Sequence, residues 1–299
     1  MCKLNFCSKI LFLFFLIPRI GFSQFYEKEQ QQTFSYGNSN PIQIEVETNN
    51  ERFIFKAINS SYYPYTVNVE YNQMINLLPY ITKETYVVYP GVSRLRDFTK
   101  KDPNQSHYYS YKYSVKIGDP SKNPEENFPY LLPLSINKKI EIEKKQLDNS
   151  LIFITNNLKV QKGDSVFCIR KGQVTALGNS RQRENVVMSN SSVEIRHIDG
   201  TVAVYQGIDL NSIQVRLGQM VFPEQFFGVA DDRNFISVSL YSIKGDGYLR
   251  QIQIKYIVED SLKILRDLEG EYVEKSELIV EKEMTRREKR LNSNGKLYN

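Results

Sequence analysis

Alternation of apolar and polar residues is the feature that most constrains the fold of this 299-residue chain. It is clearest at residues 193–206, where two alternating runs flank Asp199 and Gly200. A period of two places successive side chains on opposite faces of a strand, and an Asp-Gly pair between two such runs is typical of a hairpin turn. We therefore predict a β-hairpin here, followed by further short strands up to Tyr241.

The same alternation runs through the first third of the chain. It recurs at residues 42–46, 53–57, 65–71 and 109–117, between clusters of Asn, Ser, Pro and Gly. Short alternating strands with such turns are typical of an immunoglobulin-like antiparallel sandwich. We predict an all-β chain in which this sandwich comes first and a second β domain follows. The tyrosine-rich run 107–113 is interpreted as an amphipathic strand, with a stacking surface for sugars or a partner as the alternative.

The first 24 residues have the composition of a secretory signal peptide. Lys3 and Lys9 give a basic start, residues 10–17 are apolar, and a short exit with small residues ends at Gln24. This apolar run is shorter than the roughly 20 residues needed to span a bilayer, which argues against the alternative of a membrane anchor. The prediction is an exported protein, periplasmic or associated with the cell envelope, whose mature chain has no transmembrane span.

Cleavage would change the charge and the cysteine count. It removes Lys3, Lys9 and Arg19 and leaves 36 basic against 34 acidic side chains, a net charge of +2. Such a nearly neutral chain offers no support for nucleic-acid binding. Of the three cysteines only Cys168 would remain, so no intramolecular disulfide can form. Cys168 lies in an alternating run and is predicted to be a buried structural thiol.

Loop-rich and charged segments suggest where the domains end. Residues 118–127 are rich in Pro, Asn and Gly, and two more prolines follow by residue 133. Near the C-terminus, residues 277–291 combine good helix formers with a basic end and predict an exposed helix. The predicted divisions are a signal peptide at 1–24, the immunoglobulin-like sandwich at 25–133, the second β domain at 134–258 and a charged, partly helical extension at 259–299.

Glycine and apolar spacing over residues 153–241 resembles a known family. The matching positions are Gly163, Val166, Gly172 and Val174, then Val193, Ile195, His197, Gly200, Val204 and Tyr205, then Val215, Gly218, Val221 and Gly228, with Glu224 where a glycine is usual. This pattern is similar to that of the lysostaphin-type (LytM-like) zinc metallopeptidases, which cut peptidoglycan cross-links. The resemblance implies a LytM-like fold for the second domain.

The same resemblance implies that the zinc ligands have been replaced. In the family a His and an Asp of the first motif and the second His of a later H-x-H bind zinc. Here these motifs fall on Phe153, on Asn157 and on Phe235 with Ser237, and Gly207 takes the place of a further histidine. Zinc catalysis requires three protein ligands and an open position for water. We therefore predict no metal, no cofactor and no zinc peptidase activity.

The histidine content supports this interpretation independently of how the family motifs are matched to individual residues. After cleavage the chain contains only His107 and His197, whereas the family site uses several histidines in one pocket. His197 matches a family histidine that is not a zinc ligand, and it is interpreted as structural.

The resemblance implies a groove shaped for extended peptides. Such a groove can keep binding peptides after its metal is lost. The resemblance predicts a non-catalytic envelope protein that binds or holds a partner, or regulates cell-wall hydrolysis. The predicted partner groove consists of Phe153, Asn157, Tyr205, Gln206, Gly207, Phe235 and Ser237. Its partner would be an envelope protein or a peptidoglycan peptide. Two alternatives stay open: an accessory subunit of an outer-membrane assembly or secretion complex, and an active peptidoglycan hydrolase with an atypical site.

Overall fold

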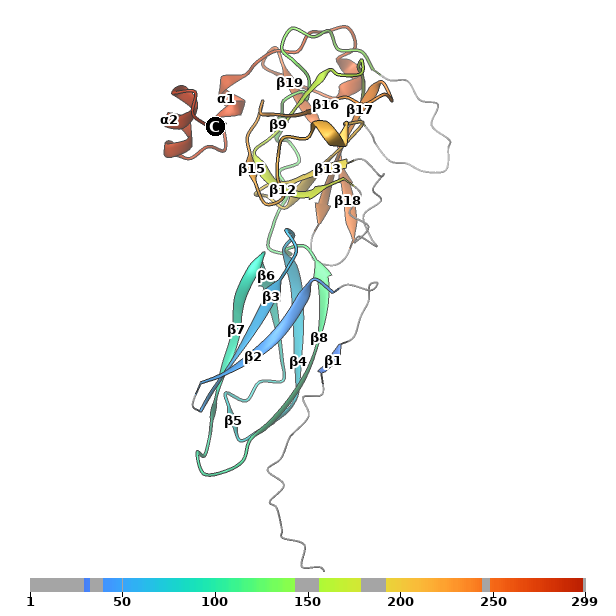
Figure 1. The fold of residues 1–299 in the computed structure, drawn as a ribbon. Helices are drawn as coiled ribbons and strands as arrows, with labels where there is room; N and C mark the ends of the chain where they lie inside the picture. Colours follow the sequence, from blue (N-terminus) through green and yellow to red (C-terminus); the bar gives the residue numbers. More distant parts are fainter. Residues whose placement is uncertain are drawn as a thin grey trace, which may run out of the picture.

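The computed structural model describes residues 30–32, 40–49, 51–142, 156–178, 192–243 and 248–297. Most of the regular structure is β-strand, in two bodies stacked end to end, with short helices near the C-terminus (Figure 1). The predicted all-β class with a terminal helical part is confirmed. The predicted signal peptide lies outside the described residues. No helix in the ranges given is long and apolar enough to cross a membrane.

The first body is a sandwich of two sheets. One sheet has the order β1 (Gln30–Gln32), β8 (Tyr108–Ile117), β4 (Tyr65–Ile75) and β6 (Lys83–Val88), and the other β2 (Ile42–Asn49), β3 (Arg52–Asn59), β7 (Gly91–Lys100) and β5 (Leu77–Leu78). Pairing is antiparallel except between β1 and β8. Inward-facing side chains of both sheets, such as Phe55 and Val69, form one apolar core. Alternation over these strands therefore predicted the sandwich, and the immunoglobulin-like topology stays a prediction.

Tyrosines of β8 close one side of this sandwich. Tyr111 and Tyr113 are buried, and the Tyr113 hydroxyl donates to the Ile42 carbonyl of edge strand β2 at 3.0 Å. An otherwise unpaired carbonyl of the edge strand is thereby satisfied. The tyrosine-rich run is thus a strand, as predicted, and these two rings serve packing rather than a stacking surface.

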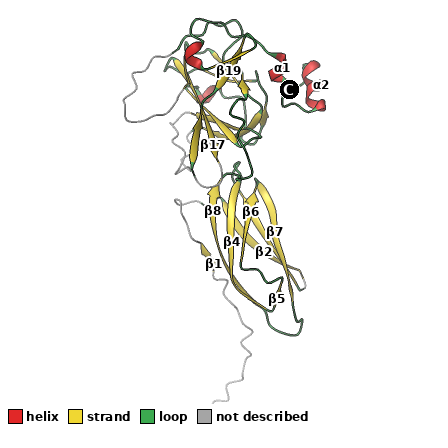
Figure 2. Ribbon diagram, turned by 180° about the vertical axis from the view of Figure 1, so that it is seen from behind, coloured by secondary structure: helices red, strands yellow, loops and turns green. Residues whose placement is uncertain are grey.

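The second body is built around a larger antiparallel sheet. In the described residues its order is β10 (Asn156–Lys159), β17 (Phe235–Ile243), β14 (Thr201–Gln206), β13 (Ser192–Arg196), β12 (Gly172–Leu177) and β15 (Met220–Val221), with β18 (Leu249–Ile252) also paired to β17. Two small sheets flank it, namely β11 (Ser165–Phe167) with β16 (Phe226–Val229), and β9 (Pro129–Tyr130) with β19 (Lys255–Val258) and β20 (Ser261–Lys263). Short 3-10 helices occur at Leu210–Ser212 and Leu265–Asp267. Figure 2 shows the strand-rich character of both bodies.

The hairpin predicted around Asp199 and Gly200 is confirmed. β13 and β14 pair antiparallel, and the chain reverses between Arg196 and Thr201. Gly200 has φ +84°, a left-handed conformation that favours glycine, and the Asp199 carboxylate accepts from the Thr201 N–H and hydroxyl. Local turn chemistry therefore agrees with the alternation on either side.

Packing in the second body reaches past the two predicted domain limits. Phe128 and Tyr130, which precede residue 134, lie in its core together with Leu268 and Val273, which follow residue 258. The parallel pairing of β9 with β19 explains the first of these additions, because it brings the end of the loop-rich segment onto the second body. The packing unit of the second domain thus begins before residue 134 and continues past residue 258.

The exposed terminal helix predicted over 277–291 is present, but it covers fewer of these residues than predicted. Two short helices are present, α1 (Glu277–Val280) and α2 (Arg286–Ser293), beside the second body (Figure 1). Thr285 starts α2 with a capping box: its side chain accepts from the Glu288 N–H, and the Glu288 side chain accepts from the Thr285 N–H. This cap fixes a new N-terminus inside the expected helix. The segment is also partly buried, because Val280 and Met284 pack against Leu131 and Phe222.

The two bodies meet in a close junction. Tyr63 packs with Val202, Val204 and Ile243 in a small apolar cluster. Beside it, a Cβ added to Gly218 would lie 2.5 Å from the Tyr62 ring, and one added to Gly200 would lie 2.7 Å from the Lys122 Cβ. Backbone of the second body therefore contacts side chains of the first with no room for a methyl group.

Candidate functional site

Three of the predicted groove residues form a row across neighbouring strands. Asn157 of β10 lies opposite Ser237 of β17, and Ser237 lies opposite Gln206 of β14. Directly opposed residues of antiparallel strands project from the same face of a sheet. Ser192 of β13, opposite Gln206, extends the row. We call these four residues the groove row.

The face that carries the groove row is largely buried, with polar side chains around the row and Val202 and Val204 of β14 further along. Ser237 and Ser192 are buried, as is Glu194 one position further along the same face of β13, whereas Asn157 and Gln206 are partly exposed. The opposite face of the sheet is the apolar core. Buried polar atoms normally have a hydrogen-bond partner. The buried Asn157 Oδ1 has none in the part of the chain that the structure describes.

Phe235 and Gly207 lie next to one another at the end of this face. Gly207 has φ +89°, and a Cβ added there would lie 2.0 Å from the Phe235 carbonyl oxygen. No side chain fits at residue 207 in this backbone, which explains the glycine where the resemblance implied a histidine. Phe235 is partly exposed, and the Arg233 guanidinium lies 5.9 Å from its ring centre. This end of the face thus carries an aromatic ring beside an arginine.

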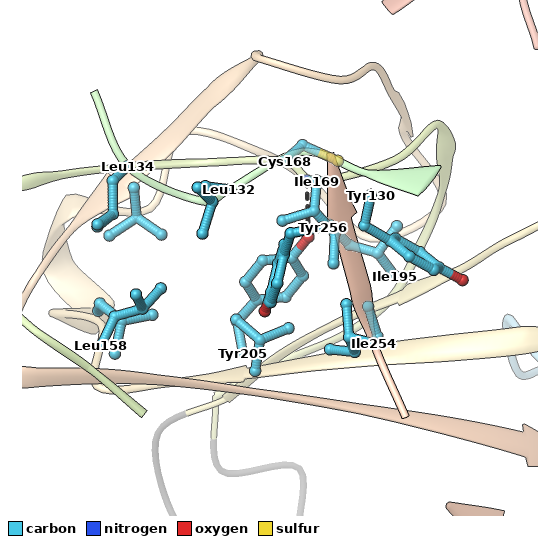
Figure 3. Close-up of a cluster of buried hydrophobic side chains, with 14 of the residues drawn as sticks. Tyr130, Leu132, Leu134, Leu158, Cys168, Ile169, Ile195, Tyr205, Ile254 and Tyr256 are labelled. Carbon is cyan, nitrogen blue, oxygen red and sulfur yellow. Dashed lines mark hydrogen bonds between the residues drawn. The ribbon is translucent and has the colours of Figure 1, made fainter. Parts of the chain in front are cut away.

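Tyr205 lies on the other face and does not line the groove. Its ring is fully buried in the core near Cys168 and Tyr256, and its hydroxyl accepts from the Ile169 N–H at 3.0 Å (Figure 3). Burial raises the pKa of this phenol well above its ordinary value. Because neighbouring residues of a strand point to opposite faces, Tyr205 and Gln206 could not both have faced the groove. Phe153, the remaining predicted member, lies outside the described residues.

The histidines lie apart, and neither belongs to the groove row. His107 packs on Phe53 in the first body, with ring centres 4.4 Å apart. His197 is fully buried, with Nδ1 2.9 Å from the Lys171 carbonyl oxygen. Within the described ranges, no group of three or more His, Cys, Asp or Glu side chains could hold a metal ion. The carboxylate nearest the groove row along β13, Glu194, instead accepts a hydrogen bond from Tyr63 of the first body.

Burial keeps His197 and Cys168 uncharged. Desolvation, followed by the charge of Arg170, holds the pKa of His197 well below its ordinary value of 6.5. Desolvation raises the pKa of the Cys168 thiol to about 12, so the reactive thiolate is scarce at neutral pH. Cys168 is thus a buried thiol, as the sequence predicted, and the structural role of His197 stays a prediction.

A buried arginine is the site that sequence reasoning missed. Arg170 is 1% exposed and donates to Asp199, to Glu283 and to the Tyr130 hydroxyl. Its guanidinium also lies 3.6 Å from the centre of the Phe128 ring. These partners come from segments far apart in the chain, so no local pattern around Arg170 could have indicated the cluster.

Comparisons with known proteins give remote structural likenesses. No protein-family model matches the chain, and no curated protein matches it. The catalytic domain of EnpA, a prophage-encoded M23 protein of Enterococcus faecalis, is similar at 14% identity over 40% of this chain and 93% of that chain, with a TM-score of 0.30. The catalytic domain of the peptidase lysostaphin from Staphylococcus simulans is similar at 10% identity over 45% and 90%, with a TM-score of 0.28. Csd3 of Helicobacter pylori is similar at 12% identity over 87% and 79%, with a TM-score of 0.32.

These structures have the LytM-like or M23 type of fold that the glycine spacing suggested. Their identities and TM-scores are too low to establish membership of a family. The residues of this chain, rather than these likenesses, therefore indicate the role of the groove row.

Proposed function

We propose that this protein is a non-catalytic binding or scaffold protein of the cell envelope, and that its former active-site groove contacts a peptidoglycan peptide or an envelope protein. The observation that carries the proposal is the groove row, in which Asn157, Ser237 and Gln206 stand side by side on one face. Amide and hydroxyl groups in a row suit hydrogen bonding to an extended peptide. The partly exposed side chains of Asn157 and Gln206 are the members of the row that a peptide can reach.

The same row supports a non-catalytic role. Asn157 and Ser237 occupy positions that the resemblance assigns to zinc ligands, and they are cross-strand neighbours, as two ligands of one ion would be. Both side chains are neutral. Zinc sites in proteins are formed by Cys, His, Asp and Glu, so this pair favours hydrogen bonding over metal binding.

Binding would be tested with purified protein on isolated sacculi and on crosslinked envelopes. The double variant Asn157→Ala, Gln206→Ala should reduce recovery on the partner at least tenfold, because each substitution removes hydrogen-bonding groups from the row. Gln214→Ala is the matched control, since Gln214 is an exposed amide outside the row. Retention of neither sacculi nor any envelope protein by the unmodified chain would remove the basis of the proposal.

Catalysis is tested separately by metal analysis and a peptidoglycan hydrolysis assay. We expect substoichiometric zinc and no hydrolysis. Stoichiometric zinc together with hydrolysis that a chelator abolishes would establish the atypical hydrolase instead. Crosslinking to components of an outer-membrane complex, lost when residues 25–117 are removed, would identify an accessory subunit.

A further inference from the structure

Arg170 joins the C-terminal segment, residues 277–297, to the turn of the β13–β14 hairpin. It donates to the two carboxylate oxygens of Glu283, which lies between α1 and α2, at 2.6 and 3.1 Å, and to Asp199 Oδ2 at 2.9 Å. A buried guanidinium needs carboxylate partners because it has lost its hydration. Glu283 and Asp199 therefore share the neutralisation of one charge.

Asp199 also holds the segment between the two bodies. Its Oδ2 atom accepts the backbone N–H of Glu125 at 3.1 Å. Lys282 of the C-terminal segment reaches the same residue, with Nζ 3.1 Å from the Glu125 carboxylate. The interdomain segment 118–128 is thus attached to the C-terminal segment directly, through Lys282, and indirectly, through Arg170 and Asp199.

At its other end the interdomain segment is fixed to the first body. The Gly118 N–H donates to the Pro64 carbonyl at 2.8 Å, and the Gly118 carbonyl accepts from the Thr66 hydroxyl at 2.9 Å. Lys122 lies against Gly200 of the hairpin turn. One of the attachments between the two bodies is therefore a segment whose middle is held by Asp199.

We propose that the C-terminal segment controls how firmly the first domain is seated on the second, through the chain of contacts Glu283, Arg170, Asp199 and Glu125. When Glu283 is withdrawn, Asp199 becomes the remaining carboxylate that neutralises Arg170. The same Asp199 Oδ2 atom accepts from Arg170 and from the Glu125 N–H, so a stronger attraction of this oxygen to the guanidinium competes with the Glu125 hydrogen bond. Among the described residues of this segment only Val280 and Met284 are buried, and they pack with Leu131 and Phe222. Release of this segment would thereby loosen the attachment of the interdomain segment to the second body.

Hydrogen exchange on the full chain tests this. Glu283→Gln keeps the shape of the side chain and removes its charge. We expect amide exchange at Lys122, Glu125 and Phe128 to accelerate at least tenfold, with β4 and β8 unchanged. The matched control is Glu277→Gln, which removes the same charge from the same segment but from a residue paired with Lys275, and it should leave the interdomain amides unchanged.

Two further variants separate the routes. Glu283→Asp retains the charge with a shorter reach and should give an intermediate acceleration. Lys282→Gln removes the direct contact to Glu125 and should change the exchange rates less than Glu283→Gln. The proposal is overturned if Glu283→Gln leaves the interdomain amides within twofold of the unmodified chain, accelerates both sheets of the first body equally, or is matched by Lys282→Gln.

Discussion

The phenol of Tyr63 in the first domain donates a hydrogen bond to the buried carboxylate of Glu194 in the second. Glu194 lies on the polar face that also carries the groove row, so the first domain bounds this face at one end. Val202 and Val204 pack around the same tyrosine. The face of the sheet that carries the groove row therefore also contacts the first body, through Glu194, Val202 and Val204.

Replacing Tyr63 by phenylalanine should destabilise the protein. The substitution preserves the ring packing and removes one donor from a buried carboxylate, which costs about 1–3 kcal/mol. Urea unfolding would show this as a lower free energy of unfolding at an unchanged m-value. Tyr89→Phe is the matched control: Tyr89 is 42% exposed, and its partner Asp119 keeps hydrogen bonds from Ser121, so the loss should be smaller. Equal losses for the two variants would contradict the role given to Tyr63.

Gly218→Ala should disturb the junction more than an equivalent change elsewhere. Gly218 has φ +81°, and a Cβ there would lie 2.5 Å from the Tyr62 ring. Gly163 has a similar φ of +89° with nothing within 4 Å of the added Cβ, so Gly163→Ala measures the backbone strain alone, about 1 kcal/mol. We expect a larger loss of unfolding free energy for Gly218→Ala, partly recovered by adding Tyr62→Ala. Equal losses at the two glycines would mean that the contact with Tyr62 adjusts without cost.

His197 should make the protein less stable as the pH falls from 7 to 5.5. Its folded-state pKa is lowered by burial and by Arg170, so below about 6.5 the unfolded chain binds a proton that the folded chain does not. Stability is then lost on acidification, by about 1 kcal/mol over this interval. His197→Asn, in which an amide can replace Nδ1 toward the Lys171 carbonyl, should flatten this dependence, as measured by urea unfolding at both pH values. His107 is less buried, so His107→Gln should change the slope less. An unchanged pH dependence in His197→Asn would argue against this assignment.

Alternation predicted the parts of the fold in which one face of a strand is buried. It indicated the strands around Ile42, Phe55 and Tyr65 and the hairpin at Asp199, because a period of two and turn chemistry are both local properties. Alternation did not identify Asn157 and Ser237 as groove residues. The resemblance did, and the structure shows that the two residues are paired across β10 and β17. Because Tyr205 and Gln206 are neighbours in one strand, alternation also predicts that Tyr205 faces the core when Gln206 faces the groove.

Features that depend on contacts between distant segments could not be predicted from local sequence patterns. The buried Arg170 depends on Asp199 and Glu283, which are 29 and 113 residues away, and its isolated position in the chain resembles that of a surface arginine. The break between α1 and α2 had a local signal, since Thr285 and Glu288 have the spacing of a capping box. Burial of Val280 against Leu131 had none, because it depends on where β9 and the C-terminal segment meet.

The assignment of the erased zinc ligands can be tested by restoring them. The variant with Phe153→His, Asn157→Asp and Ser237→His would supply the His, Asp and His set that the resemblance implies. Asn157 and Ser237 are cross-strand neighbours, with Cβ atoms expected about 5 Å apart, which allows both new side chains to reach one ion at about 2.1 Å. We expect one zinc per chain, measured by mass spectrometry of the metal content, and a higher unfolding temperature with zinc than with chelator.

A displaced ligand provides the control for this restoration. Moving the last histidine from residue 237 to residue 239 keeps it on the same face of β17 but shifts it by about 7 Å along the strand. That variant, with Phe153→His and Asn157→Asp unchanged, should hold at least a hundredfold less tightly bound zinc, because one ion cannot span the longer separation. Equal zinc binding by both variants, or none by either, would mean that the ligand positions were assigned wrongly. Zinc bound only by the first would show that this sheet keeps the geometry of a metal site while its residues no longer supply the ligands.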